Sequence, residues 1–292
     1  MLLDRAIARL LPAVPKPVVQ LFSSRYIAGS NLADAVRVVR RLNAEGKLAT
    51  IDVLGEEVTH EDETRAIADA YRGVFAAIDR EALDSNVSVK LTALGLHLSY
   101  DLCKENLEHV LSQGRFVRID MEDSSTTDPT IQLYRELREA GHENVGIVLQ
   151  AYLRRTLADV GALEDLKPNV RLCKGIYVEP PSLAYADPDS IRASFVQCLD
   201  ALLDAGAYVA AATHDEELIG AALARDVPEF QMLLGVREER ASELVAQGRR
   251  LRVYVPFGEQ WYRYSLRRLQ ENPAMAGAIA RATVGRALGR TS

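Results

Sequence analysis

The segment NVRLCKGIYV, residues 169–178, is one of eight short apolar runs that decide the fold of this chain. The other seven are ATIDVLG (49–55), NVSVKLTALG (86–95), FVRIDME (116–122), NVGIVLQAYL (144–153), AYVAAAT (207–213), EFQMLLG (229–235) and LRVYVPFG (251–258). Each run is rich in Val, Ile or Leu, or in small apolar residues, and has the length of a strand buried in a parallel sheet.

Longer stretches with helical periodicity separate these runs. Apolar residues recur at intervals of three and four in TRAIADAYRGVFAAIDREAL (64–83), IRASFVQCLDALLDAG (191–206) and ERASELVAQG (239–248). Eight strands alternating with helices predict an α/β fold, a distorted (βα)8 TIM-type barrel over residues 49–272. The alternative is a doubly wound open sheet, which the absence of a G-x-G-x-x-G phosphate-binding sequence disfavours.

The segments outside the barrel are expected to be helical or irregular. Residues 1–48 are expected to form helices packed on the barrel, with NLADAVRVVRRLNAEG (31–46) the clearest, and residues 273–292 a C-terminal tail. The N-terminal apolar run is interrupted by Asp4, Arg5 and three prolines, so it is too broken for a transmembrane helix or a signal peptide.

Composition excludes several classes of protein. The 292 residues are 48% hydrophobic, and 35 basic against 41 acidic residues give a net charge of -6, which does not favour nucleic-acid binding. Three widely spaced cysteines suit a reducing cytoplasm, and no histidine has the spacing of a metal site, so no bound metal is expected.

Charged side chains occur in runs that should be buried. Lys90, Asp120, Arg171 and Lys174 come from three different runs and stand near their C-terminal ends, where barrel enzymes place their active sites. Lysine is almost never buried without a partner, so these four are expected to line one functional mouth. For the similarly placed Arg118, Gln231 and Arg252, a structural role is equally favoured.

A basic segment, WYRYSLRRLQEN (261–272), follows the last predicted strand. On a helix, Tyr264, Arg267, Arg268 and Glu271 would share one side. Paired guanidinium groups suit a carboxylate ligand because each can donate two hydrogen bonds to two oxygens. Because this helix would start at the barrel mouth, the residues predict a barrel enzyme that acts on a small carboxylate.

Seven strings, taken in order, resemble the proline dehydrogenase family. They are SVKLTALG (88–95), VRIDMED (117–123), VLQAYLRRT (148–156), VRLCKGIYVEP (170–180), ATHD (212–215), RVYVPFG (252–258) and YRYSLRRLQEN (262–272). The resemblance implies a barrel whose displaced last helix covers the mouth and which binds FAD noncovalently. It implies oxidation of L-proline to Δ1-pyrroline-5-carboxylate by hydride transfer to flavin N5, the first step of proline degradation to glutamate, with electrons then passing to a membrane quinone.

The resemblance also implies a role for individual residues. Asp120 and Arg171 would be catalytic, Asp120 by positioning cationic groups and Arg171 beside flavin N5. The substrate would be bound by Lys90, Leu172, Tyr177, Tyr254, Tyr264, Arg267 and Arg268. The cofactor would be bound by Met121, Gln150, Arg171, Lys174, Gly175, Ile176, Thr213 and His214. Glu56 would pair with Arg267 as a gate when the site is empty.

Two alternatives and one open question remain. A Schiff-base aldolase with Lys174 or Lys90 as the nucleophile would have the same fold, and so would a non-catalytic carboxylate-binding barrel.

The expected location is cytoplasmic, with peripheral contact at the inner face of the cell membrane as an option. The tail 273–292 carries three arginines and no acidic residue, but its three glycines favour a packed helix or a frayed end over a membrane anchor.

Overall fold

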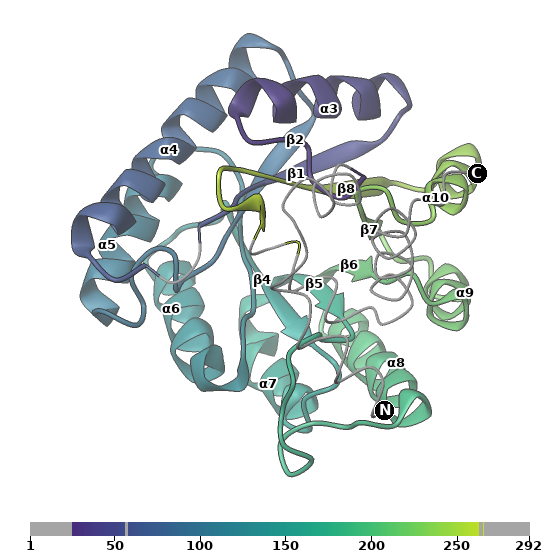
Figure 1. Ribbon diagram of the computed structural model, residues 1–292. Helices are drawn as coiled ribbons and strands as arrows, with labels where there is room; N and C mark the ends of the chain where they lie inside the picture. The colour runs from purple at the N-terminus through teal and green to yellow at the C-terminus, as the bar shows by residue number, and fades with distance from the viewer. Residues whose placement is uncertain (1–24, 56–57, 263–264, 266–292) are drawn as a thin grey trace, which may run out of the picture.

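The computed structural model describes residues 25–55, 58–262 and 265, and it shows a closed barrel of eight parallel strands (Figure 1). Each strand pairs with the next one along the chain, and β8 closes the barrel on β1 with Tyr254 opposite Thr50. The predicted (βα)8 fold is therefore confirmed. The helix predicted to cover the mouth and the tail 273–292 fall largely or wholly outside the described residues.

Each strand lies within one of the eight apolar runs or begins one residue before it. They are β1 (Leu48–Val53), β2 (Ser85–Val89), β3 (Val117–Ile119), β4 (Val145–Gln150), β5 (Asn169–Cys173), β6 (Tyr208–Ala212), β7 (Glu229–Leu233) and β8 (Leu251–Phe257). Lys90, Asp120 and Lys174 therefore follow directly after β2, β3 and β5, at the mouth of the barrel.

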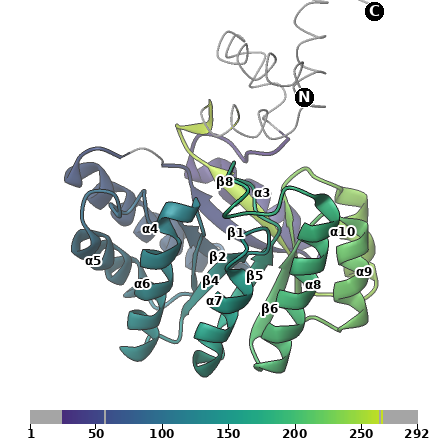
Figure 2. The ribbon, with the colours of Figure 1, turned by 90° about the horizontal axis from the view of Figure 1, so that it is seen from below.

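The helices form the outer ring, as the side view in Figure 2 shows. They are α3 (Leu32–Ala44), α4 (Glu61–Arg80), α5 (Tyr100–Leu111), α6 (Thr127–Glu139), α7 (Thr156–Leu163), α8 (Pro188–Asp204), α9 (Glu216–Ala224) and α10 (Glu238–Ala246), with short 3-10 turns η2 (Ser124–Thr126) and η3 (Glu164–Leu166). The helices predicted from periodicity correspond to α3, α4, α8 and α10. None of the described helices has the length and apolarity needed to cross a membrane.

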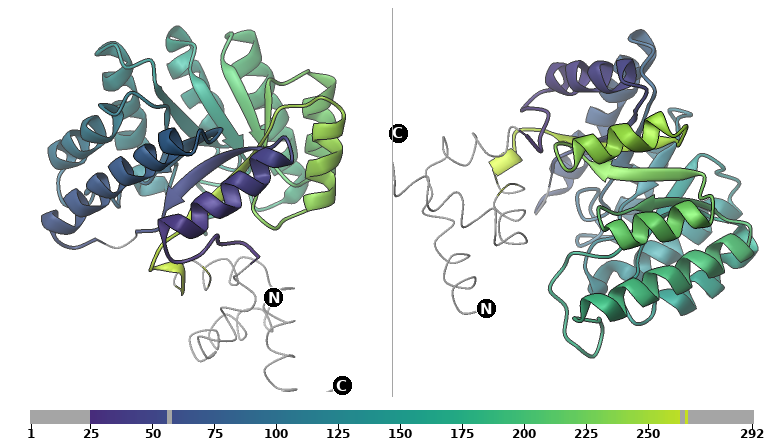
Figure 3. Two further views of the ribbon diagram at one scale, coloured as in Figure 1. Left: turned by 90° about the horizontal axis from the view of Figure 1, so that it is seen from above. Right: turned by 90° about the vertical axis from the view of Figure 1, so that its right-hand side faces the viewer.

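Helix α3 lies along β1 and β8 (Figure 3). The Asn31 side chain begins it by accepting a hydrogen bond from the Asp34 amide at 3.0 Å, which satisfies one of the open amides of the first turn. Its buried face, with Val39 fully enclosed, belongs to the same apolar core as the outer faces of the strands. The division into 1–48, 49–272 and 273–292 stays a prediction.

The strands have an apolar face and a polar face, which explains why they contain charged residues. In β5, Arg171 makes a hydrogen bond across the barrel to Ser88 of β2 and therefore points inward. Its neighbours Val170 and Leu172 are fully buried in the apolar core. Because side chains alternate along a strand, the apolar residues face the helices and the polar ones fill the interior of the barrel.

A buried ion pair lies in this interior between neighbouring strands. Arg252 of β8 donates to both carboxylate oxygens of Glu229 in β7, at 2.9 and 3.1 Å, and to the carbonyl of Ala49 at 2.7 Å. Burial alone would raise the pKa of Glu229, but Arg252 and the amide of Gln231 outweigh it and lower this pKa to about 2. Arg252 therefore has a structural role.

Arg118 also proves structural. Its guanidinium donates to the carbonyls of Ile147 and Asn169, at 3.1 and 2.7 Å, and to the Asn169 side chain at 2.6 Å. Burial lowers its pKa to about 9. Arg118 thus joins β3 to β4 and β5 below the mouth.

Glu229→Gln should lower the free energy of unfolding by about 3 kcal/mol at pH 7, because the variant loses a buried carboxylate with a depressed pKa. This contribution is complete above about pH 4.5 and is lost as the pH falls toward about 2, so the two proteins should converge in acid. Urea unfolding at several pH values measures the difference.

The control is Glu139→Gln, which removes a carboxylate from a surface pair with Arg135. It should change stability far less than Glu229→Gln does. Equal losses in the two variants, or a Glu229→Gln loss that does not shrink in acid, would contradict the structural role assigned to the buried pair.

Candidate active site

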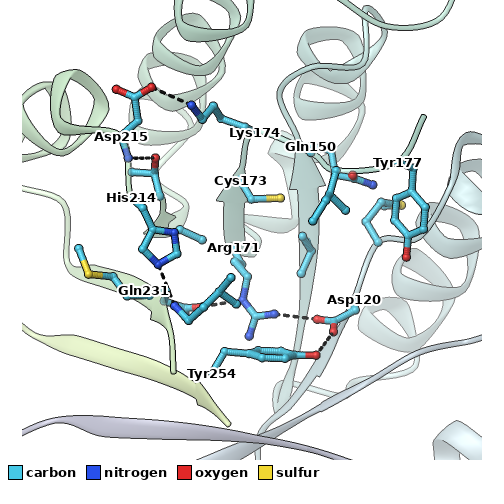
Figure 4. Close-up of a pocket in the computed structure, with 18 of the residues that line it drawn as sticks. Asp120, Gln150, Arg171, Cys173, Lys174, Tyr177, His214, Asp215, Gln231 and Tyr254 are labelled. Carbon is cyan, nitrogen blue, oxygen red and sulfur yellow. Dashed lines mark hydrogen bonds and ion pairs between the residues drawn. The ribbon is translucent and has the colours of Figure 1, made fainter. Parts of the chain in front are cut away.

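A cavity of about 510 Å³ lies at the C-terminal ends of the strands. It brings together most of the residues predicted to form the site (Figure 4). Those that line it are Lys90, Asp120, Met121, Gln150, Arg171, Lys174, Gly175, Ile176, Tyr177, Thr213, His214 and Tyr254. They come from six strands or the loops that follow them, so the closed barrel makes neighbours of residues far apart in the chain.

The carboxylate of Asp120 joins three strands at the floor of the cavity. Its Oδ1 accepts hydrogen bonds from Ser88 Oγ at 2.6 Å and Arg171 Nη1 at 2.7 Å. Its Oδ2 accepts from the Tyr254 hydroxyl at 2.9 Å. Because both oxygens are occupied, this carboxylate fixes the positions of a cation and an aromatic ring together (Figure 4).

Lys90 lies beside this group and is held from below by Asp52. Its Nζ is 2.8 Å from Asp52 Oδ2, 3.3 Å from the Tyr254 hydroxyl and 3.9 Å from Asp120 Oδ2. Burial raises the pKa of Asp52, although the ammonium of Lys90 acts in the opposite direction. The lysine that the sequence singled out thus belongs to a buried ion pair and also faces the cavity.

Arg171 is the cation nearest the centre of the barrel. Its Nε donates to the side-chain oxygen of Gln231, and its Cζ lies 5.2 Å from the centre of the Tyr254 ring. Its Nη2 is buried and has no hydrogen-bond partner among the described residues. A buried guanidinium donor without a partner is costly, so this atom is suited to a ligand that accepts a hydrogen bond in the cavity.

A second cationic group lies at the rim. Lys174 Nζ and Arg192 Nε both donate to Asp215 Oδ2, at 2.7 and 2.9 Å. Burial raises the pKa of Asp215, but these two cations outweigh it and the net shift is downward. The neighbouring His214 accepts the Leu233 amide at its Nε2, at 3.0 Å, so the ring proton is on Nδ1.

Gly175 allows the chain to pass close to an aromatic ring. Its φ is +110°, and a Cβ at this position would lie 2.0 Å from Cδ1 of the buried Tyr152. The loop that follows is anchored by Glu179, whose carboxylate accepts hydrogen bonds from the amide and the hydroxyl of Ser124, both at 2.7 Å. These contacts place the loop that carries Ile176 and Tyr177 beside the cavity.

One predicted site residue is not at the cavity. Leu172 is fully buried in the apolar core between Arg171 and Cys173, which both line the cavity. The alternation of a strand therefore turns Leu172 toward the helices, and its expected place in the substrate pocket is wrong. Glu56, Tyr264, Arg267 and Arg268 lie outside the described residues.

The structure adds two inward residues that the sequence did not mark as functional, Asp52 and Ser88. Both are fully buried and both contact the predicted site. The signal for Asp52 was present, because an acidic residue in the middle of the apolar run 49–55 needs a cationic partner. Ser88 carried no such signal, since a serine can satisfy its hydroxyl locally.

A closed (βα)8 barrel whose mouth is lined by lysine, arginine and buried carboxylates is typical of a barrel enzyme with a cationic active site. The family model described as proline dehydrogenase matches residues 35–281. Proline dehydrogenase 1 of Bacillus subtilis subsp. natto is 40% identical over 272 residues, which are 89% of this chain and 90% of the relative. Proline dehydrogenase of Deinococcus radiodurans is 34% identical over 273 residues, 88% of each chain.

A larger protein of known structure contains a similar fold. The crystal structure of proline utilization A from Bdellovibrio bacteriovorus, inactivated by N-propargylglycine, matches with a TM-score of 0.78 and 27% identity. The match covers 86% of this chain, which spans about a third, 32%, of that longer chain. The chain belongs to the proline dehydrogenase family and is an oxidoreductase.

Gly175→Ala should destabilise the protein by more than about 2 kcal/mol, because alanine meets both an unfavourable φ and the ring of Tyr152. The matched control is Gly114→Ala, at φ +75° with nothing within 4 Å, which should cost only about 1 kcal/mol. Denaturant unfolding of both variants measures this. Equal losses would show that the approach to Tyr152 has no energetic importance.

Proposed function

We propose that the chain oxidises L-proline to Δ1-pyrroline-5-carboxylate with noncovalently bound FAD as the electron acceptor, the first step of proline degradation to glutamate. Membership of the proline dehydrogenase family supports the reaction. The observation that carries the cofactor assignment is the buried Nη2 of Arg171, which has no hydrogen-bond partner among the described residues and belongs to a side chain lining the cavity.

The cavity suits a flavin nucleotide in the groups that line it. Its lining offers amide and guanidinium donors from Gln150 and Arg171 for a polar ring system and the ammonium of Lys174 for phosphate. Gly175 presents backbone without a side chain at the rim. The residues proposed to hold FAD are Met121, Gln150, Arg171, Lys174, Gly175, Ile176, Thr213 and His214. When bound, FAD supplies the two-electron acceptor for the hydride that leaves the proline ring carbon next to nitrogen.

The substrate is proposed to be held by its carboxylate. Lys90 and the predicted clamp of Arg267 and Arg268 would bind the two oxygens, with Tyr177, Tyr254 and Tyr264 against the ring. Fixing the carboxylate restricts the orientation of the reacting carbon, which is an entropic contribution to rate. Asp120 positions the Tyr254 ring and the Arg171 guanidinium through its three hydrogen bonds.

The fixed charge of Arg171 is proposed to act on the reaction itself. Oxidation of a neutral amine by hydride loss moves negative charge onto the acceptor, and a buried cation nearby stabilises that charge. Arg171 is held by Ser88, Asp120 and Gln231, so it needs no rearrangement during the reaction. The pair of Glu56 and Arg267 is proposed to close the site when substrate is absent.

The oxidant that takes electrons from the reduced flavin is proposed to be a membrane quinone, reached by a cytoplasmic enzyme at the inner face of the cell membrane. A quinone resides in the bilayer, so a peripheral contact is required rather than a membrane-spanning segment. The basic tail 273–292 is one candidate for this contact.

The Schiff-base alternative is disfavoured by the ion pairs. An aldolase nucleophile must be a neutral amine, whereas Lys90 pairs with Asp52 at 2.8 Å and Lys174 with Asp215 at 2.7 Å. Flavin bleaching by L-proline distinguishes a dehydrogenase from a barrel that only binds carboxylates.

Purified protein should be yellow, and L-proline added without oxygen should bleach the visible flavin absorbance, because the substrate passes two electrons to the flavin. L-Prolinamide, which lacks the carboxylate, should bleach it much more slowly at the same concentration. Stopped-flow absorbance measures both rates. A colourless protein, or a flavin that L-proline leaves oxidised, would refute the proposed function.

Arg171→Met should lower turnover per bound flavin at least about tenfold, because a preorganised cation is lost from the reacting centre. Its FAD content should fall much less, since several other residues contribute to binding. Arg135→Met, at an exposed ion pair on α6, is the control and should change neither quantity. Full turnover per flavin in Arg171→Met would remove this residue from the mechanism.

A further inference from the structure

Asp52 is a fully buried carboxylate beneath the cavity. It lies on β1, and its side chain is only 1% exposed. It is not among the residues that line the cavity, which Lys90 and Asp120 do line. Asp52 therefore cannot touch a ligand in that cavity directly, and any effect it has there must pass through another side chain.

The contacts of Asp52 identify that side chain as Lys90. Oδ2 accepts from Lys90 Nζ at 2.8 Å, and Oδ1 is buried with no hydrogen-bond partner among the described residues. A carboxylate in this situation depends on its neighbouring cation, since an unpaired buried charge is strongly unfavourable. The dependence is mutual, because the Lys90 side chain is only 10% exposed.

Asp120 is less suited to be the counter-ion of Lys90, although it also carries a negative charge. Its nearer oxygen is 3.9 Å from Lys90 Nζ, beyond hydrogen-bond distance. Its oxygens already accept from Ser88, Arg171 and Tyr254. The other ionisable groups that face Lys90 are the hydroxyls of Tyr254 and Tyr71 and the carboxyl of Glu122.

We propose that Asp52 is a positioning residue: it is the fixed counter-ion that keeps Lys90 charged and held at the cavity floor, ready to bind the carboxylate of the substrate. This inference rests on the proposed function and deepens it. Asp52 lies on a barrel strand and is enclosed, so it stays below while the Lys90 side chain lines the cavity above it. Burial acts to raise the pKa of Asp52, and the ammonium opposes that shift.

The direct test is Asp52→Asn, which keeps the shape and removes the charge. Cyclopentanecarboxylate, which has the ring and carboxylate of proline without its nitrogen, serves as the probe, and its competitive inhibition constant against L-proline is measured from about pH 7 to pH 9. In the wild type the constant should change less than about twofold. In Asp52→Asn it should rise at least about tenfold with pH, because a buried lysine that has lost its nearest carboxylate loses its proton at lower pH.

Two controls separate this effect from general damage. Asp159→Asn removes another buried carboxylate, which pairs with Arg155 at 2.9 Å on the outer ring, and its inhibition constant should stay independent of pH. Asp52→Asn combined with Lys90→Arg should also lose the pH dependence, because arginine remains charged throughout this range. An inhibition constant in Asp52→Asn that matches the wild type at every pH overturns the proposal.

A stability cycle tests the same pair without substrate or turnover. If Asp52 and Lys90 depend on each other, the variant with both Asp52→Asn and Lys90→Met should have a higher Tm than Asp52→Asn alone, because it no longer buries an ammonium that has lost its nearest carboxylate. Strictly additive losses would overturn the proposal even if Asp52→Asn proved too unstable to assay. Failure of L-proline to reduce the wild-type flavin would instead refute the proposed function and leave this cycle to decide on the pair.

Discussion

The site depends on the pairing of charges inside a closed barrel. Among the described residues, three acidic side chains in this interior each have a cationic partner: Asp52 with Lys90, Asp120 with Arg171, and Glu229 with Arg252. An unpaired charge in this interior would cost several kcal/mol, so each pair constrains two strands relative to each other. The cations at the mouth are therefore parts of the barrel's internal structure as much as of its active site.

The pairs divide the interior into two levels. Glu229 and Arg252 lie below, where neither lines the cavity, and Asp120 and Arg171 lie above, where both do. Gln231 joins the levels: its amide nitrogen donates to Glu229 at 2.6 Å, and its oxygen accepts from Arg171. The hydrogen bond to Glu229 orients the Gln231 amide so that its oxygen, rather than its nitrogen, faces Arg171. A structural ion pair thus orients a residue at the active site.

The sequence predicted the fold and the position of most site residues for a simple physical reason. Parallel strands that close into a barrel bring all their C-terminal ends to one mouth, so Lys90, Asp120 and Lys174 had to converge whatever the register. The register itself could not be read from the sequence. The contact between Arg171 and Ser88, two residues 83 positions apart, depends on it. Leu172 was misplaced because neighbours in a strand point to opposite sides, so proximity to Arg171 in sequence did not imply proximity to the cavity.

The unsatisfied hydrogen-bond donor of Arg171 links ligand binding to the stability of the fold. In this guanidinium, Nη1 donates to Ser88 and Asp120 and Nε donates to Gln231, while the buried Nη2 has no partner among the described residues. A buried donor without an acceptor destabilises the folded state by about 1–3 kcal/mol. A ligand that accepts this hydrogen bond meets it only in the folded barrel, since the unfolded chain exposes Arg171 to water. Occupancy of the cavity should therefore stabilise the fold by an amount that rises with the logarithm of ligand concentration, and the same unsatisfied atom that weakens the empty barrel selects for a bound acceptor.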